Sequence, residues 1–238
     1  MDRKELKATA KAAFKANYWK CVLVSFIMSL LVGGTVSSSA NTTTNAAVDG
    51  TGSSNVKELI DLIKNNKEVA IAVASIIFGT IAVVSLIATL IDAFLINPLK
   101  MGGSAFYLKN TDDSDAKIDE MTRGFKPAYK RNVLALFLKD LIVGLLSLLL
   151  IVPGVIKSLS YKLVPYILAQ DDEISANDAL KKSTELMKGH KWEAFVLGLS
   201  FIPWILFGIV TLGFGMLLYV EPYMDATNAE YCKRIING

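Results

Sequence analysis

The sequence has few of the residues that most catalytic and metal sites require. Its 238 residues include one histidine, His190, and two cysteines, Cys21 and Cys232, which lie at opposite ends of the chain. It contains no HExxH, CxxC, GxSxG or phosphate-binding-loop motif. We therefore expect no catalytic residue, no cofactor and no metal ligand, and a protein that is not an enzyme.

An excess of charge of one sign is also lacking. The chain has 25 basic and 22 acidic side chains, for a net charge of +3, and no basic stripe with interleaved aromatic residues. This composition argues against a nucleic-acid partner. Asp112, Asp113 and Asp115 lie close together but lack the spacing and glycine of a calcium loop, so we expect them to form a solvated face.

Apolar residues, by contrast, are abundant and clustered. They make up 53% of the chain, and residues 69–96 form a nearly unbroken apolar run, long enough to span a membrane. We predict an all-α fold, a polytopic membrane helical bundle that forms one domain over residues 1–238. The lipid bilayer is its first expected partner. About six spans are expected, at residues 19–36, 69–96, 133–152, 155–169 and 194–210, and one starting near residue 215.

Two assignments stay open at this stage. Residues 193–220 could form one long helix, although the sequence TLGFG at residues 211–215 favours a break and two spans. The first apolar segment could be a cleaved signal peptide, with Ser38-Ser39-Ala40 as the cleavage site. The long, structured leader and the spans that follow favour a retained helix, followed by a Ser/Thr-rich loop at residues 35–55.

Lysine and arginine predict the orientation, because cytoplasmic loops carry an excess of both. Basic residues concentrate before the first span, after the second and after the fourth, whereas the long loop between the first two spans has only three lysines. We expect a multi-pass protein of the cell membrane with both termini in the cytoplasm.

Two charged segments have the pattern of amphipathic helices. In residues 2–15, one stripe carries Leu6, Ala10, Ala13 and Phe14. Residues 175–188 form the second segment, for which Ser175 is the expected N-cap and Gly189 the expected C-cap. We predict that such helices lie on the membrane surface and precede the odd-numbered spans.

Prolines near the ends of the even-numbered spans suggest an internal repeat. They are Pro98, Pro165 and Pro222, and a further Pro153-Gly154 pair predicts a tight turn between spans three and four. The pattern is consistent with three helical hairpins, at residues 1–110, 111–170 and 171–238. The alternative is that proline and Gly-Lys are simply common at membrane borders.

Charged residues inside the apolar segments are the sharpest candidates for function, because their burial is costly. Similar depths predict two ion pairs, Asp92 with Lys139 and Lys162 with Glu221. We favour a packing role for both pairs over a substrate or proton path. Lys157 is expected to extend to the outer surface.

Several motifs together resemble a known family. They are NYWK, INPLKMGG, the PG turn with IKSLSY, ISANDALKKSTELMKGHKWE, and TLGFG with EPYMDATNAEY. They look like bacterial integral membrane proteins of domain-of-unknown-function family 975, over nearly the whole chain except the Ser/Thr-rich loop. More distantly, the chain is similar to the membrane domain attached to some glycerophosphodiester phosphodiesterases. The resemblance implies a multi-pass helical fold in the cytoplasmic membrane and no settled activity.

Two classes of function fit these features. The first is a non-enzymatic membrane scaffold or accessory protein that binds lipid or a protein partner. The second is a small transporter or permease for a lipid-like or peptide substrate. An apolar groove beside the surface helices would favour the first, and a water-filled cavity reaching Lys162 and Glu221 would favour the second.

Overall fold

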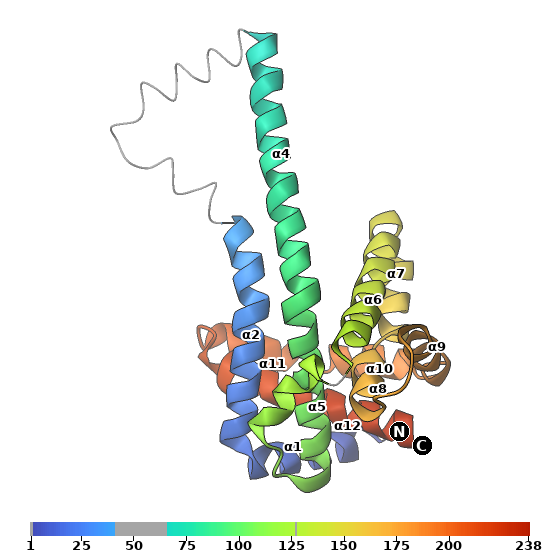
Figure 1. The fold of residues 1–238 in the computed structure, drawn as a ribbon. Helices are drawn as coiled ribbons and strands as arrows, with labels where there is room; N and C mark the ends of the chain where they lie inside the picture. The colour runs from blue at the N-terminus through green and yellow to red at the C-terminus, as the bar shows by residue number, and fades with distance from the viewer. Residues whose placement is uncertain (1, 41–65, 127) are drawn as a thin grey trace. The chain divides into compact units, whose positions relative to one another are not determined.

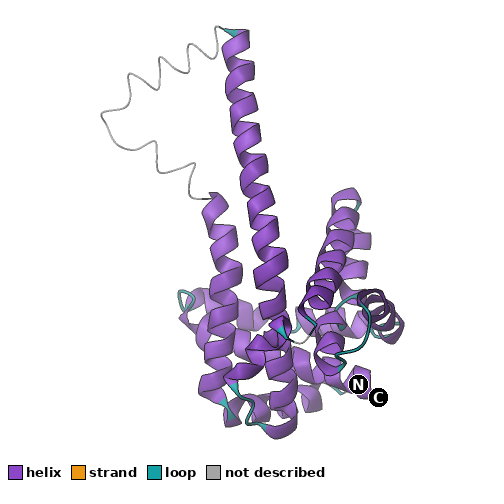
Figure 2. Ribbon diagram, viewed as in Figure 1, coloured by secondary structure: helices purple, strands orange, loops and turns teal. Residues whose placement is uncertain are grey.

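The chain folds into helices only, over the part that the structure describes. The computed structural model describes residues 2–40, 66–126 and 128–238, and every regular element in these ranges is helical (Figure 2). This confirms the all-α prediction. The predicted helix at residues 56–67 and much of the Ser/Thr-rich loop lie outside the described residues. Two compact units are present, Met1–Leu30 with Ala93–Gly238, and Leu31–Asp92.

The smaller unit contains a long apolar helix. Helix α4 (Lys67–Ile91) begins where the Asn66 side chain accepts a hydrogen bond from the Glu68 backbone N–H, at 3.1 Å. None of its side chains is buried, and apolar residues occur all round it. A helix that is apolar on every face is stable in the hydrocarbon core of a membrane. Its 25 residues extend about 37 Å, enough to cross a bilayer.

Four helices of the described chain are long and apolar enough to cross a membrane. They are Lys67–Asp113, Tyr129–Leu149, Ile151–Gln170 and Lys191–Val210. In helix α2 (Tyr18–Ala40), residues Tyr18–Ser29 form a shorter apolar stretch. After the turn where a sixth span was expected, a π-helix, η4 (Met216–Val220), leads directly into the polar helix that begins at Glu221. This stretch is not among the four helices long and apolar enough to cross a membrane.

Three helices that each have a proline as their second residue form the centre of the larger unit. They are α5 (Asn97–Asp113), α8 (Val164–Gln170) and α12 (Glu221–Asn237), and each packs against the other two. Large side chains in this core, such as Phe106, Leu168 and Tyr231, are almost completely buried.

Helix α1 (Arg3–Ala16) covers this core, which corrects the prediction of a helix lying on the membrane surface. Its buried residues are Leu6, Ala10, Ala13 and Phe14, the predicted stripe. This stripe packs against α12 and α5. The amphipathic pattern was therefore interpreted correctly, but its apolar face contacts protein.

The second amphipathic helix, α9 (Ala176–Leu186), begins as predicted. The Asp178 backbone N–H donates to the Ser175 hydroxyl at 3.2 Å, and Gly189 has a φ of +86° just after the helix. Its buried face carries Ala179, Leu180 and Ser183 and packs against α6 (Tyr129–Leu149) and α8. Between α5 and α6 the chain forms a 3₁₀-helix, η3 (Ile118–Phe125), packed on α5.

The hairpin of α6 and α7 (Ile151–Ser160) turns at a different residue from the one predicted. The chain reverses at Leu150, where the backbone is extended, and Pro153 and Gly154 lie in the first turn of α7. Proline is compatible with this position because the first N–H groups of a helix have no intrahelical acceptor. Gly154 permits close helix contact, since a Cβ there would lie 2.1 Å from the Ser147 hydroxyl.

Three other breaks shape the C-terminal half. A turn at residues 161–163 separates α7 from α8, and another at residues 200–201 separates α10 (Lys191–Leu199) from α11 (Ile202–Val210). The third follows α11, where Leu212 and Gly213 have φ of +55° and +90°. Residues 193–220 are thus not one helix, and the break predicted at residues 211–215 is confirmed.

Candidate functional site

The predicted helix-break prolines occupy equivalent places in three helices. Pro98, Pro165 and Pro222 each lie in the first turn of a core helix, α5, α8 or α12. Two of these helices follow directly on a π-helix, η2 (Asp92–Ile96) before α5 and η4 before α12. Whether residues 1–110, 111–170 and 171–238 are copies of one hairpin stays a prediction.

Tyrosine hydroxyls compensate for two of these prolines. A proline has no N–H to donate to the carbonyl four residues earlier. For Pro98 that carbonyl belongs to Phe94, and it accepts from the Tyr129 hydroxyl at 2.7 Å. For Pro222 it belongs to Leu218, and it accepts from the Tyr18 hydroxyl at 3.1 Å. Sequence reasoning missed these contacts, although both tyrosines begin the helices of odd-numbered spans.

The structure does not bring together the predicted pair of Lys162 and Glu221. Lys162 lies in the turn between α7 and α8, with its ammonium 5.4 Å from the centre of the Tyr231 ring. The Glu221 carboxylate instead accepts from the Ser29 hydroxyl at 3.2 Å. Tyr231 is ten residues beyond Glu221 on α12, about 15 Å along the axis, which explains the separation.

The remaining predicted charges lie near the start of α5 and within α6. The Lys139 ammonium is 3.2 Å from the carboxylate of its neighbour Asp140. Asp140 also accepts from the Asn97 side-chain amide at 2.7 Å, which joins α6 to α5. Asp92 is the first residue of the π-helix η2, and its pairing with Lys139 stays a prediction.

A polar cluster between α2, α5 and α12 was not anticipated. The Ser25 hydroxyl donates to the Asp225 carboxylate at 2.8 Å and lies 2.6 Å from the Tyr107 hydroxyl. Tyr107 in turn donates to the Cys21 carbonyl at 2.8 Å. Burial raises the pKa of Asp225 to about 6. The sequence contained one signal for this cluster. Ser25 and Ser29, like Glu221 and Asp225, are four residues apart and so lie on one face of a helix.

A groove of about 450 Å³ lies between α6, α7 and α9 and is the principal candidate binding site. Three lysines from two elements line it, Lys157 of α7 with Lys181 of α9 and Lys188 just beyond that helix. Ile142 and Leu180 provide apolar wall. Lys157 therefore faces the charged helix α9, whereas it was expected to extend to the outer surface.

A second cavity, of about 320 Å³, lies beside the α7–α8 turn. Its lining includes Lys139, Asp140 and Lys162, and it shares Tyr161 with the groove. The Lys157 ammonium lies 4.5 Å from the centre of the same Tyr161 ring. The two spaces thus place five lysines, with the carboxylates of Glu185 and Asp140, around one segment, α7 and the turn after it. The excess of cationic groups over carboxylates suits a phosphate or another anion.

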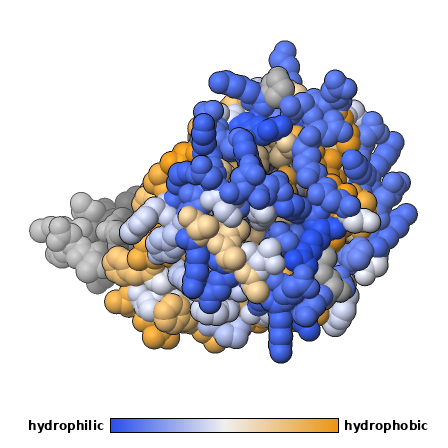
Figure 3. Space-filling view, turned by 90° about the horizontal axis from the view of Figure 1, so that it is seen from below, coloured by the Kyte–Doolittle hydropathy of each residue, from blue (hydrophilic) through white to orange (hydrophobic). Residues whose placement is uncertain are grey.

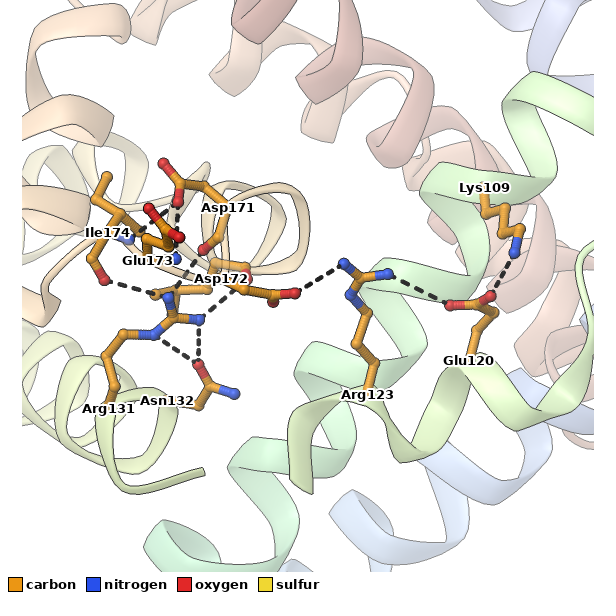
Figure 4. A network of polar contacts seen from close by, with 10 residues as sticks. Lys109, Glu120, Arg123, Arg131, Asn132, Asp171, Asp172, Glu173 and Ile174 are labelled. Atoms are coloured by element: carbon orange, nitrogen blue, oxygen red, sulfur yellow. Dashed lines mark hydrogen bonds and ion pairs between the residues drawn. The ribbon is translucent and has the colours of Figure 1, made fainter. Parts of the chain in front are cut away.

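A network of polar contacts holds the loop that leads into α9 (Figure 4). The Arg131 guanidinium donates to the carbonyls of Asp171 and Ile174 at 2.8 and 3.2 Å. The Asp171 carboxylate accepts from two backbone N–H groups, of Glu173 and Ile174, which lowers its pKa. These contacts fix the start of α9, and with it one wall of the groove.

The same network reaches the 3₁₀-helix η3. Arg123 lies 3.5 Å from Asp172, and Glu120 of η3 is paired with Lys109 of α5 at 2.5 Å (Figure 4). The loop before α9 is therefore connected through charged side chains to the core helix α5.

Comparison with known proteins gives one match. The profile of a family described as "Protein of unknown function (DUF975)" matches residues 146–237, which confirms the predicted resemblance over that region. The matched region contains the α7 segment, α9 and α12, whereas the NYWK and INPLKMGG motifs precede it. Neither the search of curated proteins nor that of solved structures gave a significant match.

Proposed function

We propose that the protein is a non-enzymatic accessory protein of the cell membrane. Its ligand is an anionic phospholipid, bound in the groove between α6, α7 and α9 by the headgroup. The three lysines of the groove lie within the matched residues 146–237. The proposal rests on one observation, the convergence of Lys157, Lys181 and Lys188 on a groove with an apolar wall.

The groove suits a phospholipid better than it suits a free anion. Its apolar wall includes Ile142 of α6. Further along α6, the side chains of Leu145 and Leu148 are 59% and 87% exposed. A headgroup phosphate held by the lysines would leave acyl chains against this apolar hairpin. Basic pockets beside membrane helices bind acidic headgroups through the same combination of charge and apolar contact.

Lipid binding by the purified protein tests this proposal. Protein in mild detergent is titrated with phosphatidylglycerol or phosphatidylcholine, and bound lipid is counted by native mass spectrometry. We expect phosphatidylglycerol to bind at least ten times more tightly. Replacing Lys157, Lys181 and Lys188 together by glutamine should abolish this preference, while Lys182→Gln, an exposed lysine of α9 outside the groove, should retain it.

Two results would contradict the proposal. One is equal binding of the two lipids by the wild-type protein. The other is an unchanged phosphatidylglycerol preference in the triple variant, provided that its elution from a size-exclusion column is that of a folded protein.

A transporter is the second candidate, and the cavity beside the α7–α8 turn favours it. That cavity reaches Lys162 and contains both a cation and a carboxylate, Lys139 and Asp140. Transport would require a flux of an anionic lipid or peptide across proteoliposomes that Lys162→Met stops. An accessory protein would bind lipid without such a flux, so the two functions are separable in one preparation.

A further inference from the structure

We infer that the α6–α7 hairpin inserts into one leaflet of the bilayer and returns to the same side. Its partner is the acyl-chain region of the leaflet that faces the lysine-rich helix α9. The sequence had predicted that this hairpin crosses the membrane twice.

The first step is the short apolar length of the α6–α7 hairpin. Above Lys139 and Asp140, α6 has nine residues to its end at Leu149, or about 13 Å. On the way back, α7 has six residues from Ile151 before Lys157, or about 9 Å. The hydrocarbon core is about 30 Å thick, so the apolar part of this hairpin reaches about half-way.

The second step fixes the level of those charges. Lys157 lines the groove together with Lys181 and Lys188, and α9 also exposes Lys182 and Glu185 to solvent. A helix with so many exposed charges lies outside the hydrocarbon core. Because Lys157 is at the level of this helix, the tip of the hairpin is only about 9 to 13 Å further in.

The surface of the tip fits a hydrocarbon partner. The side chains from Leu148 to Val152 are between 60% and 87% exposed. Such contiguous apolar surface is unfavourable in water. On the face opposite this tip, hydrophilic residues predominate (Figure 3). The larger unit thus has an apolar hairpin tip on one side and a hydrated face on the other, as a hairpin embedded in one leaflet requires.

Cysteine labelling in membranes tests the inference. The native cysteines, Cys21 and Cys232, are buried, so the wild-type chain serves as the blank. Single cysteines are placed at the tip as Leu150→Cys and Val152→Cys. Lys182→Cys reports the lysine-rich side, and Ser53→Cys, in the loop between the first two spans, reports the opposite side expected from the sequence.

A membrane-impermeant maleimide should label the tip cysteines from either side at less than a tenth of the level of the control on that side. A bimane probe on the tip cysteines should be quenched more by a nitroxide deep in the acyl chain than by one near the headgroup. Two tip positions guard against one variant that fails to fold.

Each alternative result overturns the inference. Labelling of the tip from the side of Ser53→Cys would mean that the hairpin crosses the membrane. Labelling from the side of Lys182→Cys would mean that the tip lies in water. A bimane probe that no nitroxide lipid quenches would mean that the tip is buried in protein.

Discussion

The carboxyl group of Asp225 accepts a hydrogen bond from a serine inside the larger unit. The Ser25 hydroxyl donates to it at 2.8 Å, and Ser25 is also paired with Tyr107. Asp225 lies on α12, outside the four helices that are long and apolar enough to cross a membrane. Burial raises its pKa from the ordinary value of 3.8 to about 6, and the charge of Glu221 adds to the rise.

This raised pKa predicts how stability depends on pH. Between about pH 4 and pH 6 the unfolded chain has already lost the Asp225 proton while the folded chain retains it, so stability falls as the pH rises through this interval. The loss is complete above pH 6 and is on the order of 3 kcal/mol. Asp225→Asn should remove this decline.

The measurement compares the thermal unfolding of detergent-solubilised protein at pH 4.5 and pH 7.5. The difference in Tm between the two pH values should be smaller in Asp225→Asn than in the wild type. Asp113→Asn, which replaces an exposed aspartate of the same unit, is the control and should keep the wild-type difference. An Asp225→Asn variant with the full wild-type decline would show that another group is responsible.

At the scale of elements, α5 and α12 share one arrangement. Each follows directly on a π-helix and has a proline in its first turn. The widened turn and the proline leave a carbonyl without its usual N–H donor, and a tyrosine of another helix provides one. Tyr129 serves the carbonyl before Pro98 and Tyr18 the carbonyl before Pro222. The proline breaks are therefore places where one hairpin is attached to the next.

This pairing predicts energetic coupling between Tyr18 and Pro222. Tyr18→Phe should lower the free energy of unfolding by about 1 kcal/mol, because the Leu218 carbonyl loses its hydrogen bond. In a Pro222→Ala background the restored backbone N–H can bond to that carbonyl, so Tyr18→Phe should cost clearly less.

A double-mutant cycle by unfolding in mixed micelles measures this coupling. Tyr129→Phe in the same Pro222→Ala background is the matched control, since Tyr129 bonds to Phe94, and its effect should be additive. Strict additivity for Tyr18 as well would contradict the assigned role of its hydroxyl.

The positions of the helices could be predicted from the sequence better than the packing of one helix against another. The stripe of α1, the N-cap at Ser175 and the break after Val210 follow from local spacing and from turn residues, and the structure has all three. The pairing of Lys162 with Glu221 required knowing which faces of which helices meet, and no local pattern contains that information. Proline and glycine were interpreted as a turn at residues 153–154 because helix packing, which explains Gly154, is equally invisible in one sequence.

At the scale of the whole molecule, the N-terminal helix joins parts that are far apart in the chain. Lys7 contacts Ser200 at the break between α10 and α11, and Arg234 near the C-terminus lies 3.4 Å from Glu5. The two termini accordingly lie close together in Figure 1. Helix α1 therefore closes the core around α12, and its Lys7 joins it to the break between α10 and α11.

This role predicts that the apolar stripe of α1 contributes to folding stability. Phe14 is fully buried, with its ring 5.2 Å from that of Tyr18 and 5.7 Å from that of Tyr219. Phe14→Ala should lower the free energy of unfolding by about 3 kcal/mol or more, because it leaves a cavity in the core. Lys15→Gln, at an exposed position of the same helix, should have little effect.

The two possible roles of α1 differ in what each variant changes. If α1 lay on the membrane with its apolar stripe in lipid, Phe14→Ala would leave the unfolding of detergent-solubilised protein unchanged and would weaken only the association of the helix with vesicles. If the stripe is core, the variant unfolds at lower denaturant concentration even without a bilayer, and α12, which packs against α1, should lose protection from hydrogen exchange. We expect the second result, because a residue that contacts α2 and η4 through its ring cannot be removed without loosening both.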